Sequence, residues 1–356
     1  MPEYLAPGVY VEELPAQHHS IQGVSTSTVG FIGVAQQASA AVAITSFADF
    51  ERAIGGSASG DLPIAVKGFF ENGGTRCYVA LIAPTDAFQA GLDALAPENI
   101  SILCCPDEHH FPNAAAMMAA HCEQRKDRVC ILQSPQPVMP DARHDVPVHS
   151  SYAAYYYPWL TVVGLDGVTS VTVPPGGHVA GVYAQMDTQR GVWVPPAGVR
   201  LGGVIGFSQQ ISSAESDLLS SRGINLLRSL PGKGNQIWGA RTTSQNLDWK
   251  YVNIRRLAVF IEQSLSQGLQ WAVFEPNGPA LWAAVRLSVE EFLLNLWKSG
   301  GLMGPKAEEA FFVRCDNTTM TQADIDVGRF VVIVGFAPVR LAEFVILRIT
   351  TQTNCT

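Results

Sequence analysis

Charged side chains are scarce in this sequence. Asp, Glu, Lys and Arg make up 15% of the 356 residues, against about 25% in an ordinary soluble domain. So little charge is expected when much of the surface is buried against other chains. The 23 Lys and Arg are outnumbered by 31 Asp and Glu, which gives a formal net charge of −8. This balance disfavours sequence-independent nucleic-acid binding, and no nucleic-acid partner is expected.

Long apolar runs are also missing. The longest, Phe330 to Val339, is about half of the ~20 residues that a membrane-spanning helix needs. The opening residues, Met1 to Tyr4, lack the basic and then apolar design of a signal peptide. The seven cysteines have no framework spacing, which favours reduced thiols. We therefore expect synthesis in a cytoplasm, export without a cleaved signal, and no direct membrane insertion.

Motifs for catalysis and cofactor binding are lacking as well. Residues 231–234 (PGKG) have no Ser or Thr after the Lys, so they are interpreted as a tight turn rather than a phosphate loop. No Gly-x-Ser-x-Gly nucleophile elbow occurs. Residues 104–122 gather zinc-type ligands but without Cys-x-x-Cys or His-x-x-x-His spacing. We expect no catalytic, cofactor or metal site; an α/β enzyme using Asp107, His109 or His110 remains the weaker alternative.

Apolar patterning predicts an α/β body. Alternating strands and helices predict mixed, largely parallel sheets flanked by helices. Strands are predicted over residues 29–35, 76–82, 100–104, 129–132, 236–243 and 330–334, the last of them buried. Residues 152–163 are predicted to continue as a strand or as extended chain. Helices are predicted over residues 47–54, 62–70, 113–122, 178–186, 253–267 and 279–298. Thr321 to Asp324 resembles a capping box that opens a one-turn helix.

Both termini have the pattern of an extended strand. Residues 8–13 alternate in polarity at one end and are bounded by prolines, which cannot donate to a sheet ladder. Residues 343–349 are apolar on both faces as far as Leu347. A strand of this kind would aggregate if left bare, so it must be covered or paired. The sequence therefore predicts a strand-forming arm at each end of the body.

Ordered blocks at both ends resemble the contractile tail sheath family and together cover roughly two-thirds of the chain. They are residues 4–13 (YLAPGVYVEE), 25–33, 69–79 (FFENGGTRCYV), 231–234, 238–242 (WGART), 249–257 (WKYVNIRRL), 274–277 (FEPN) and 336–340 (FAPVR). One departure is Leu341, which stands where the family usually has Pro. The length is most similar to the compact sheath of an extracellular contractile injection system or a bacteriocin-like particle (tailocin).

The resemblance implies a structural subunit and no enzyme. Such a subunit polymerises helically as stacked hexameric rings around an inner tube, then contracts to drive the tube through a target membrane. Its other expected partners are baseplate proteins, terminator or cap proteins, and paralogous sheath subunits. Assembly is expected in the bacterial cytoplasm, within a phage tail or a tail-like particle that can be released from the cell. A static self-assembling shell remains an alternative.

The resemblance also implies that different parts of the chain have different roles. Four parts are expected: a linking arm (1–20), an α/β sheath domain (21–228), a conserved domain facing the tube (229–342) and a second linking arm (343–356). In the family each arm adds a strand to a sheet of a neighbouring subunit. The expected arm residues are Val9, Tyr10, Val11, Glu12, Phe344, Val345, Ile346 and Leu347. The expected tube-facing residues are Lys298, Lys306, Glu308 and Glu309.

Overall fold

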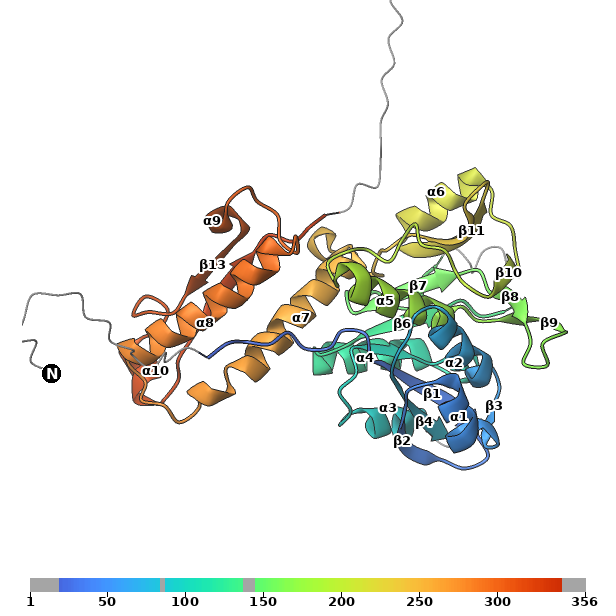
Figure 1. The fold of residues 1–356 in the computed structure, drawn as a ribbon, viewed down its shortest axis with the longest axis horizontal. Helices are drawn as coiled ribbons and strands as arrows, with labels where there is room; N and C mark the ends of the chain where they lie inside the picture. Colours follow the sequence, from blue (N-terminus) through green and yellow to red (C-terminus); the bar gives the residue numbers. More distant parts are fainter. Residues whose placement is uncertain (1–18, 84–86, 137–144, 341–356) are drawn as a thin grey trace, which may run out of the picture.

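The computed structural model describes residues 19–83, 87–136 and 145–340, and its centre is a nine-stranded sheet (Figure 1). The strand order is β12-β11-β7-β6-β5-β1-β4-β2, and β3 pairs with β1. The five neighbouring pairs from β11 to β4 are parallel, whereas β2 and β12 join the ends antiparallel. This confirms the predicted mixed, largely parallel sheet. The strands are β1 (Val29–Ala35), β2 (Ser39–Ile44), β3 (Ala58–Ser59), β4 (Cys77–Ile82), β5 (Ile102–Cys104), β6 (Val129–Gln133), β7 (Ala153–Tyr157), β11 (Ile224–Leu230) and β12 (Gly234–Trp238).

Helices cover both faces of this sheet, which explains why its central strands are apolar throughout. Successive residues of a strand point to opposite faces. Phe31 accordingly packs with α2 and α5, and Ile32 with α3 and α4. The helices are α1 (Phe47–Phe50, continued by a π-helical turn, Glu51–Gly55), α2 (Leu62–Glu71), α3 (Gln89–Leu95), α4 (Ala114–Arg125), α5 (Gly176–Arg190) and α6 (Ser213–Ser221).

Helix α5 lies against α2 with almost no space between the backbones. A Cβ on Gly177 would be 2.2 Å from the carbonyl oxygen of Ala65, and one on Gly181 would be 2.5 Å from that of Phe69. Only glycine fits at these two positions. The predicted helix at 178–186 is confirmed, and it is longer than expected because the glycines before it also belong to it.

A small antiparallel sheet extends from the main sheet. It contains β8 (Leu160–Val163), β9 (Ser170–Val173) and β10 (Val204–Phe207), in the order β10-β8-β9. The strand or extended segment predicted over residues 152–163 consists of two strands, β7 and β8, in different sheets. Pro158 lies between them, and its ring nitrogen cannot donate to either ladder.

The last third of the described chain folds around a core of its own, largely from α7, α8 and a two-stranded sheet. Its elements are α7 (Val252–Gly268), α8 (Pro279–Lys298), α9 (Ala307–Ala310), β13 (Phe311–Arg314), α10 (Gln322–Asp326) and β14 (Ile333–Phe336). We call it the helical unit. The predicted capping box is present at α10, where Thr321 and Asp324 bond to each other's backbone N–H. The buried strand predicted over 330–334 is wrong: β14 starts at Ile333 and is half-exposed, because only one of its faces packs on the core of the helical unit.

The helical unit is fastened to the body by the segment before β1, which runs along α7 in Figure 1. The ring of Phe260 covers Gly23, and Ile21 covers Gly268. The backbone N–H of Val24 donates to the hydroxyl of Ser264 at 3.1 Å. Both glycines lie where a larger residue would separate the segment from the helix.

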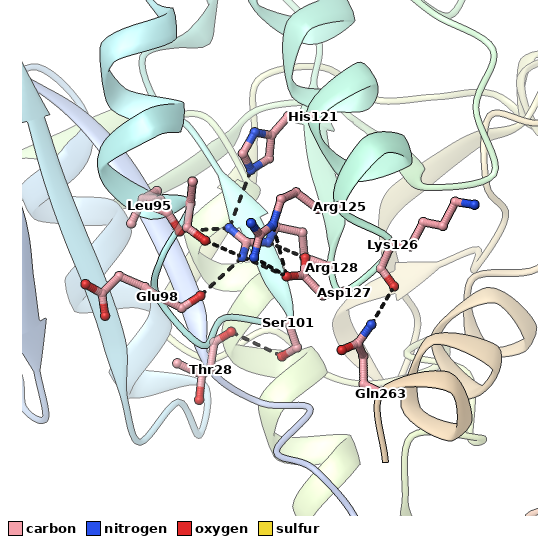
Figure 2. Close-up of polar contacts among 11 residues, drawn as sticks. Thr28, Leu95, Glu98, Ser101, His121, Arg125, Lys126, Asp127, Arg128 and Gln263 are labelled. Carbon is pink, nitrogen blue, oxygen red and sulfur yellow. Dashed lines mark hydrogen bonds and ion pairs between the residues drawn. The ribbon is translucent and has the colours of Figure 1, made fainter. Parts of the chain in front are cut away.

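A second connection lies at the start of β6, where Figure 2 shows the buried guanidinium of Arg128. It donates to the carboxylate of Asp127 at 2.6 Å and to the carbonyls of Leu95 and Glu98, at 2.9 and 3.2 Å. These bonds satisfy carbonyls at and beyond the end of α3. The amide of Gln263 in α7 donates to the carbonyl of Lys126 nearby, at 3.3 Å.

The domain boundary expected at 228/229 falls inside a hairpin. Strands β11 and β12 pair antiparallel from Leu226–Trp238 to Leu230–Gly234, so both remain in the main sheet. The turn between them is the PGKG segment, with Gly232 and Gly234 at positive φ, as a tight turn requires. Strand β12 also ends earlier than predicted, at Trp238, before the extended Gly239. Short 3-10 helices occupy Glu108–His110, Leu247–Trp249 and Gln270–Ala272.

Candidate assembly site

The two-stranded sheet of the helical unit has two open edges. Strands β13 and β14 pair antiparallel from Phe311–Phe336 to Arg314–Ile333. Within the described residues neither strand has a second partner. Each therefore offers backbone N–H and C=O groups to which an added strand can bond.

The two faces of this sheet differ. Phe311, Val313, Val334 and Phe336 pack on the core of the helical unit. The other face presents Phe312, which is 49% exposed, and Ile333, 44% exposed. The ring of Phe312 lies over Gly335, where a Cβ would be 2.1 Å from it. Among the described residues, only Arg314 lies over this face, with its guanidinium 5.3 Å from the centre of the Phe312 ring.

A groove of about 600 Å³ runs between β13 and α8. Its apolar lining comes from Leu287 and Leu294 of α8 and from residues 311–313 of β13. Three carboxylates, those of Glu290, Glu291 and Glu308, also line it. The groove thus combines apolar side chains, an open strand edge and negative charge.

One of the residues expected to face a tube, Glu308, lines this groove. Lys298 is the last residue of α8, and Lys306 is the N-cap residue of α9, which contains Glu308 and Glu309. All four are exposed. The indole N–H of Trp297 donates to the carbonyl of Gly304 at 2.9 Å, which holds the connecting loop against α8. The expected arm residues lie outside the described residues.

The two ends of the described chain leave the helical unit at opposite ends of α7 (Figure 1). His19 stacks on Trp271, just beyond the end of α7, with ring centroids 4.1 Å apart. At the other end, the amide of Asn253 donates to the carbonyl of Val339 at 3.1 Å. A helix of 17 residues spans about 25 Å. Segments that continue from these two points therefore start far apart.

The acidic residues after β5 form a buried cluster rather than an open pocket. Asp107 accepts a hydrogen bond from the backbone N–H of Asp61 at 2.9 Å, and Glu108 accepts one from that of Gln133 at 2.7 Å. Burial raises the pKa of Glu108 to about 8, and burial together with the charge of Asp107 raises that of Asp61 to about 7. Among the described residues no group of three or more His, Cys, Asp or Glu could hold a metal ion. Cys104 and Cys105 are fully buried, as packing at a strand end requires.

Sequence reasoning missed β13 and with it the groove. The signal was present as the apolar run Phe311-Phe312-Val313 between two polar stretches. No helix in the described ranges is long and apolar enough to cross a bilayer.

Comparison with known proteins agrees with this architecture. Residues 83–243 match the phage tail sheath protein central domain, and residues 244–352 match the phage tail sheath C-terminal domain. A chain of the extracellular contractile injection system PVC, from its sheath complex in the contracted state, is 31% identical with a TM-score of 0.82, and the match covers 99% of both chains. A chain of the anti-feeding prophage baseplate is also 31% identical, with a TM-score of 0.81; 99% of this chain and 100% of that chain are covered.

These matches define a structural subunit of a contractile sheath. The chain belongs to the phage tail sheath family, whose members are structural proteins. A curated relative, the tail sheath protein of Vibrio phage KVP40, is 27% identical over 187 residues, which are 51% of this chain and 27% of that protein. The chain thus matches about a quarter of the length of that relative.

Proposed function

We propose that this subunit polymerises helically, as stacked hexameric rings, around an inner tube, and that contraction of the lattice drives the tube through a target membrane. The observation that carries the proposal is the β13–β14 sheet, with two open edges and an exposed apolar face. The sequence supplies two strand-forming segments, one at each end, and the described chain leads toward them from opposite ends of α7. Each subunit would thus donate two terminal strands and offer two open sheet edges to strands of its neighbours. This number of links suits a lattice in which every copy contacts several others.

Strand addition provides a link that is strong and still able to pivot. A strand of about five residues forms about four or five backbone bonds, each worth roughly 1 kcal/mol net. Burial of Val9, Val11 or the apolar 344–347 segment against Phe312 and the groove would contribute a comparable amount. Head-to-tail links of this kind are heterologous and need not close, so they generate a helical polymer.

In this proposal the α/β body and helical unit move as one rigid body while the arms bend. The buried contacts between α7 and the body, described above for Gly23, Ser264 and Gln263, support this division. Contraction is then a rotation of rigid subunits about their linking strands. The extended lattice would be a metastable state that is released at the baseplate.

The remaining assignments are proposals of the same kind. The tube contacts are assigned to Lys298, Lys306, Glu308 and Glu309, which are exposed and charged, as a contact that must release requires. The proposed division is into arms (1–20 and 343–356), body (21–228) and tube-facing domain (229–342), although the hairpin residues 229–238 pair in the body's sheet. The further partners are a baseplate, a cap and paralogous subunits, in a particle assembled in the cytoplasm.

Negative-stain electron microscopy of the full-length protein, alone and co-expressed with its candidate tube protein, tests this function. We expect wide, empty cylinders from the protein alone and longer, narrower ones around a tube. A single lattice state under both conditions would identify a static shell instead. Uniform small particles would exclude helical assembly altogether.

A further inference from the structure

The hairpin of β8 and β9 projects from the end of the body that lies farthest from the helical unit (Figure 1). Its turn exposes two aliphatic side chains, Leu165, which is 52% exposed, and Val168, 86% exposed. The turn is nevertheless fixed. The carboxylate of Asp166 accepts hydrogen bonds from the backbone N–H groups of Val168 and Thr169, at 3.0 and 2.9 Å, and from the hydroxyl of Thr169 at 2.7 Å. An apolar pair on a rigid, projecting turn favours contact with another surface. We call residues 164–169 the hairpin tip.

The hairpin tip also carries a negative charge. Asp166 is the only charged residue in the hairpin, which extends from residue 160 to residue 173. The hydrogen bonds from Thr169 and from the backbone of Val168 lower the pKa of the Asp166 carboxyl, so it stays ionised at neutral pH. The surface that binds this tip should therefore combine an apolar lining with positive charge.

A crevice of about 330 Å³ lies where the body meets α7. Its apolar lining includes Val24, Pro97, Val259 and Phe260. A cavity of about 150 Å³ accepts a benzene molecule, so this crevice has room for two aliphatic side chains. Its charged lining residues are Glu98, Arg125, Asp127 and Arg256. We call it the junction crevice.

The wall of the junction crevice at the start of β6 has an excess of positive charge. Residues 125–128 are Arg125, Lys126, Asp127 and Arg128, three cations and one carboxylate. Arg125 and Arg128 share that carboxylate, with N–O distances of 2.9 and 2.6 Å. In Figure 2 the carboxylate of Glu98 points away from this group. The other cation of the lining, in α7, is balanced by its buried ion pair. The crevice thus offers the two properties that the hairpin tip requires.

The hairpin tip and the junction crevice lie beyond opposite edges of the main sheet. Strand β6 begins at the crevice, and β7 runs parallel beside it. Strand β8 starts only after the far end of β7 and leads away from the sheet (Figure 1). The five residues of β7 alone cover about 17 Å. A contact between the tip and the crevice therefore joins two copies of the chain.

We propose that the hairpin tip of one copy inserts into the junction crevice of a second copy. Leu165 and Val168 bury against the apolar lining, which removes apolar surface from water on both copies. The carboxylate of Asp166 pairs with the guanidinium of Arg125, which is only partly neutralised by the carboxylate that it shares. Since the two surfaces differ, the contact is head-to-tail, the kind from which helical polymers are built.

The apolar groove beside β13 is a poorer receptor for the hairpin tip. It is larger, about 600 Å³, but the carboxylates of Glu290 and Glu308 line it. Like charges brought together across an interface oppose binding, so these two residues would repel Asp166. Charge therefore distinguishes between the two apolar hollows and favours the junction crevice.

This contact rests on the proposed self-assembly but involves neither arm, so it adds a second class of link between subunits. It joins the body of one copy to the place where the body and the helical unit of the next copy meet. An inserted tip would touch both α7 and the start of β6. Binding would therefore strengthen the connection between the two parts of the receiving subunit.

Photo-crosslinking of the full-length protein tests the contact directly. The photoreactive residue p-benzoylphenylalanine replaces Val168 in unlabelled protein, which is mixed with ¹⁵N-labelled wild type and irradiated. Mass spectrometry should detect mixed-isotope peptide pairs that join residue 168 to labelled peptides containing residues 97–101 or 256–267. Self-associated protein with crosslinks from residue 168 only elsewhere, or protein that stays monomeric at every concentration, would overturn the proposal.

Substitutions give a second measurement, the lowest protein concentration at which polymer sediments. Val168→Ser, which removes an apolar contact, and Gln267→Trp, which fills the junction crevice, should each raise this concentration at least about tenfold. The matched controls are Ile205→Ser, an exposed residue of the same small sheet, and Ser266→Trp, an exposed neighbour on α7 that does not line the crevice. Thermal denaturation of dilute protein checks that every variant is folded. Equal values for each variant and its control would refute the contact.

The charge pair has its own test. Asp166→Asn keeps an oxygen that can accept the hydrogen bonds of the turn but removes the negative charge. This variant should raise the polymerisation threshold about threefold, as expected for an exposed ion pair. The threshold should also depend less on salt than that of the wild type, because one screened attraction is missing. An unchanged threshold and salt dependence would exclude Arg125 as the partner of Asp166.

The two proposals fail separately. Cylinders in electron micrographs without a crosslink from the hairpin tip to the junction crevice would leave the sheath function intact and remove this contact. Crosslinked head-to-tail chains without cylinders would retain the contact and contradict the proposed function.

Discussion

The guanidinium of Arg256 donates two hydrogen bonds to the carboxylate of Asp187, at 2.9 and 2.5 Å, and both side chains are only 3% exposed. The same guanidinium donates to the backbone carbonyl of Thr26 at 2.9 Å and lies over the ring of Tyr183. One side chain of α7 thus binds α5 and the segment before β1. This arrangement fixes the helical unit to the body.

Replacement of Arg256 by alanine should therefore destabilise the fold severely. It would leave the carboxylate of Asp187 buried without its partner, which costs about 3–5 kcal/mol. Urea denaturation followed by circular dichroism measures the loss. The matched control is Arg329→Ala, which removes an exposed ion pair to Asp324 and should cost at most about 1 kcal/mol. Equal losses in the two variants would contradict this account of the junction.

The stability contributed by Glu108 and Asp61 should fall as pH rises from about 5 to about 8. Burial raises the pKa of Glu108 to about 8 and that of Asp61 to about 7, whereas unfolded carboxyls titrate near about 4. Between these values the folded protein holds protons that the unfolded chain has released, so each further rise in pH favours unfolding. Burial lowers the pKa of His178 to about 4, which acts in the opposite direction up to the unfolded value of about 6.5. The melting temperature of the wild type should therefore decrease between about pH 6.5 and about pH 8.

Glu108→Gln provides the control for this pH dependence. Its amide oxygen can still accept the hydrogen bond from the backbone of Gln133, but the side chain has no proton to lose. The slope of melting temperature against pH should be shallower in this variant. An unchanged slope would show that Glu108 is not a source of the effect.

Phe274→Gly should stabilise the isolated subunit, because the side chain of Phe274 is fully exposed and its backbone has a φ of +74°. Glycine adopts positive φ without strain, so the variant should gain about 1 kcal/mol in the free energy of unfolding. The opposite change at Gly232, whose φ is +73°, serves as the control: Gly232→Ala should lose a similar amount. Thermal denaturation of dilute protein separates this effect from association. Destabilisation by Phe274→Gly would mean that the ring stabilises the folded monomer.

Much of the body could be predicted from the sequence because strand burial and helix spacing are local patterns. The runs that became β1, β4 and β6 are apolar enough to specify strands buried on both faces, and α8 carries a continuous apolar stripe. Prediction failed where the outcome depends on distant partners. Strand β14 is half-exposed because its second face has no cover among the residues that the structure describes, and that fact is not encoded near residue 333.

The candidate site was less predictable than the fold. Arm strands can be inferred from a pattern of apolar residues and prolines, but the acceptor sheet requires residues 311–314 and 333–336 to meet across an intervening segment. Likewise, the cleft beside the start of α7 is lined by three separate stretches of sequence, 145–149, 221–223 and 241–250. Such sites are defined by tertiary contacts, so a single sequence indicates their parts and not their assembly.

Deletion of residues 1–13 should abolish polymerisation and leave a folded, soluble subunit. Folding should survive because the segment that fastens α7 begins later, at Ile21 and Gly23, whose contacts with Gly268 and Phe260 remain. Polymerisation should fail because one of the two donors for the open β13 and β14 edges is gone, along with about four or five backbone bonds per link. Circular dichroism should show an unchanged melting transition, and micrographs should show no cylinders.

Substitution of Val9 and Val11 by proline, which keeps the length of the arm but removes two backbone N–H donors, should reproduce the effect of the deletion. Normal cylinders from either variant would contradict strand donation by this arm, and an unfolded deletion variant would mean that residues 1–13 belong to the fold of their own subunit.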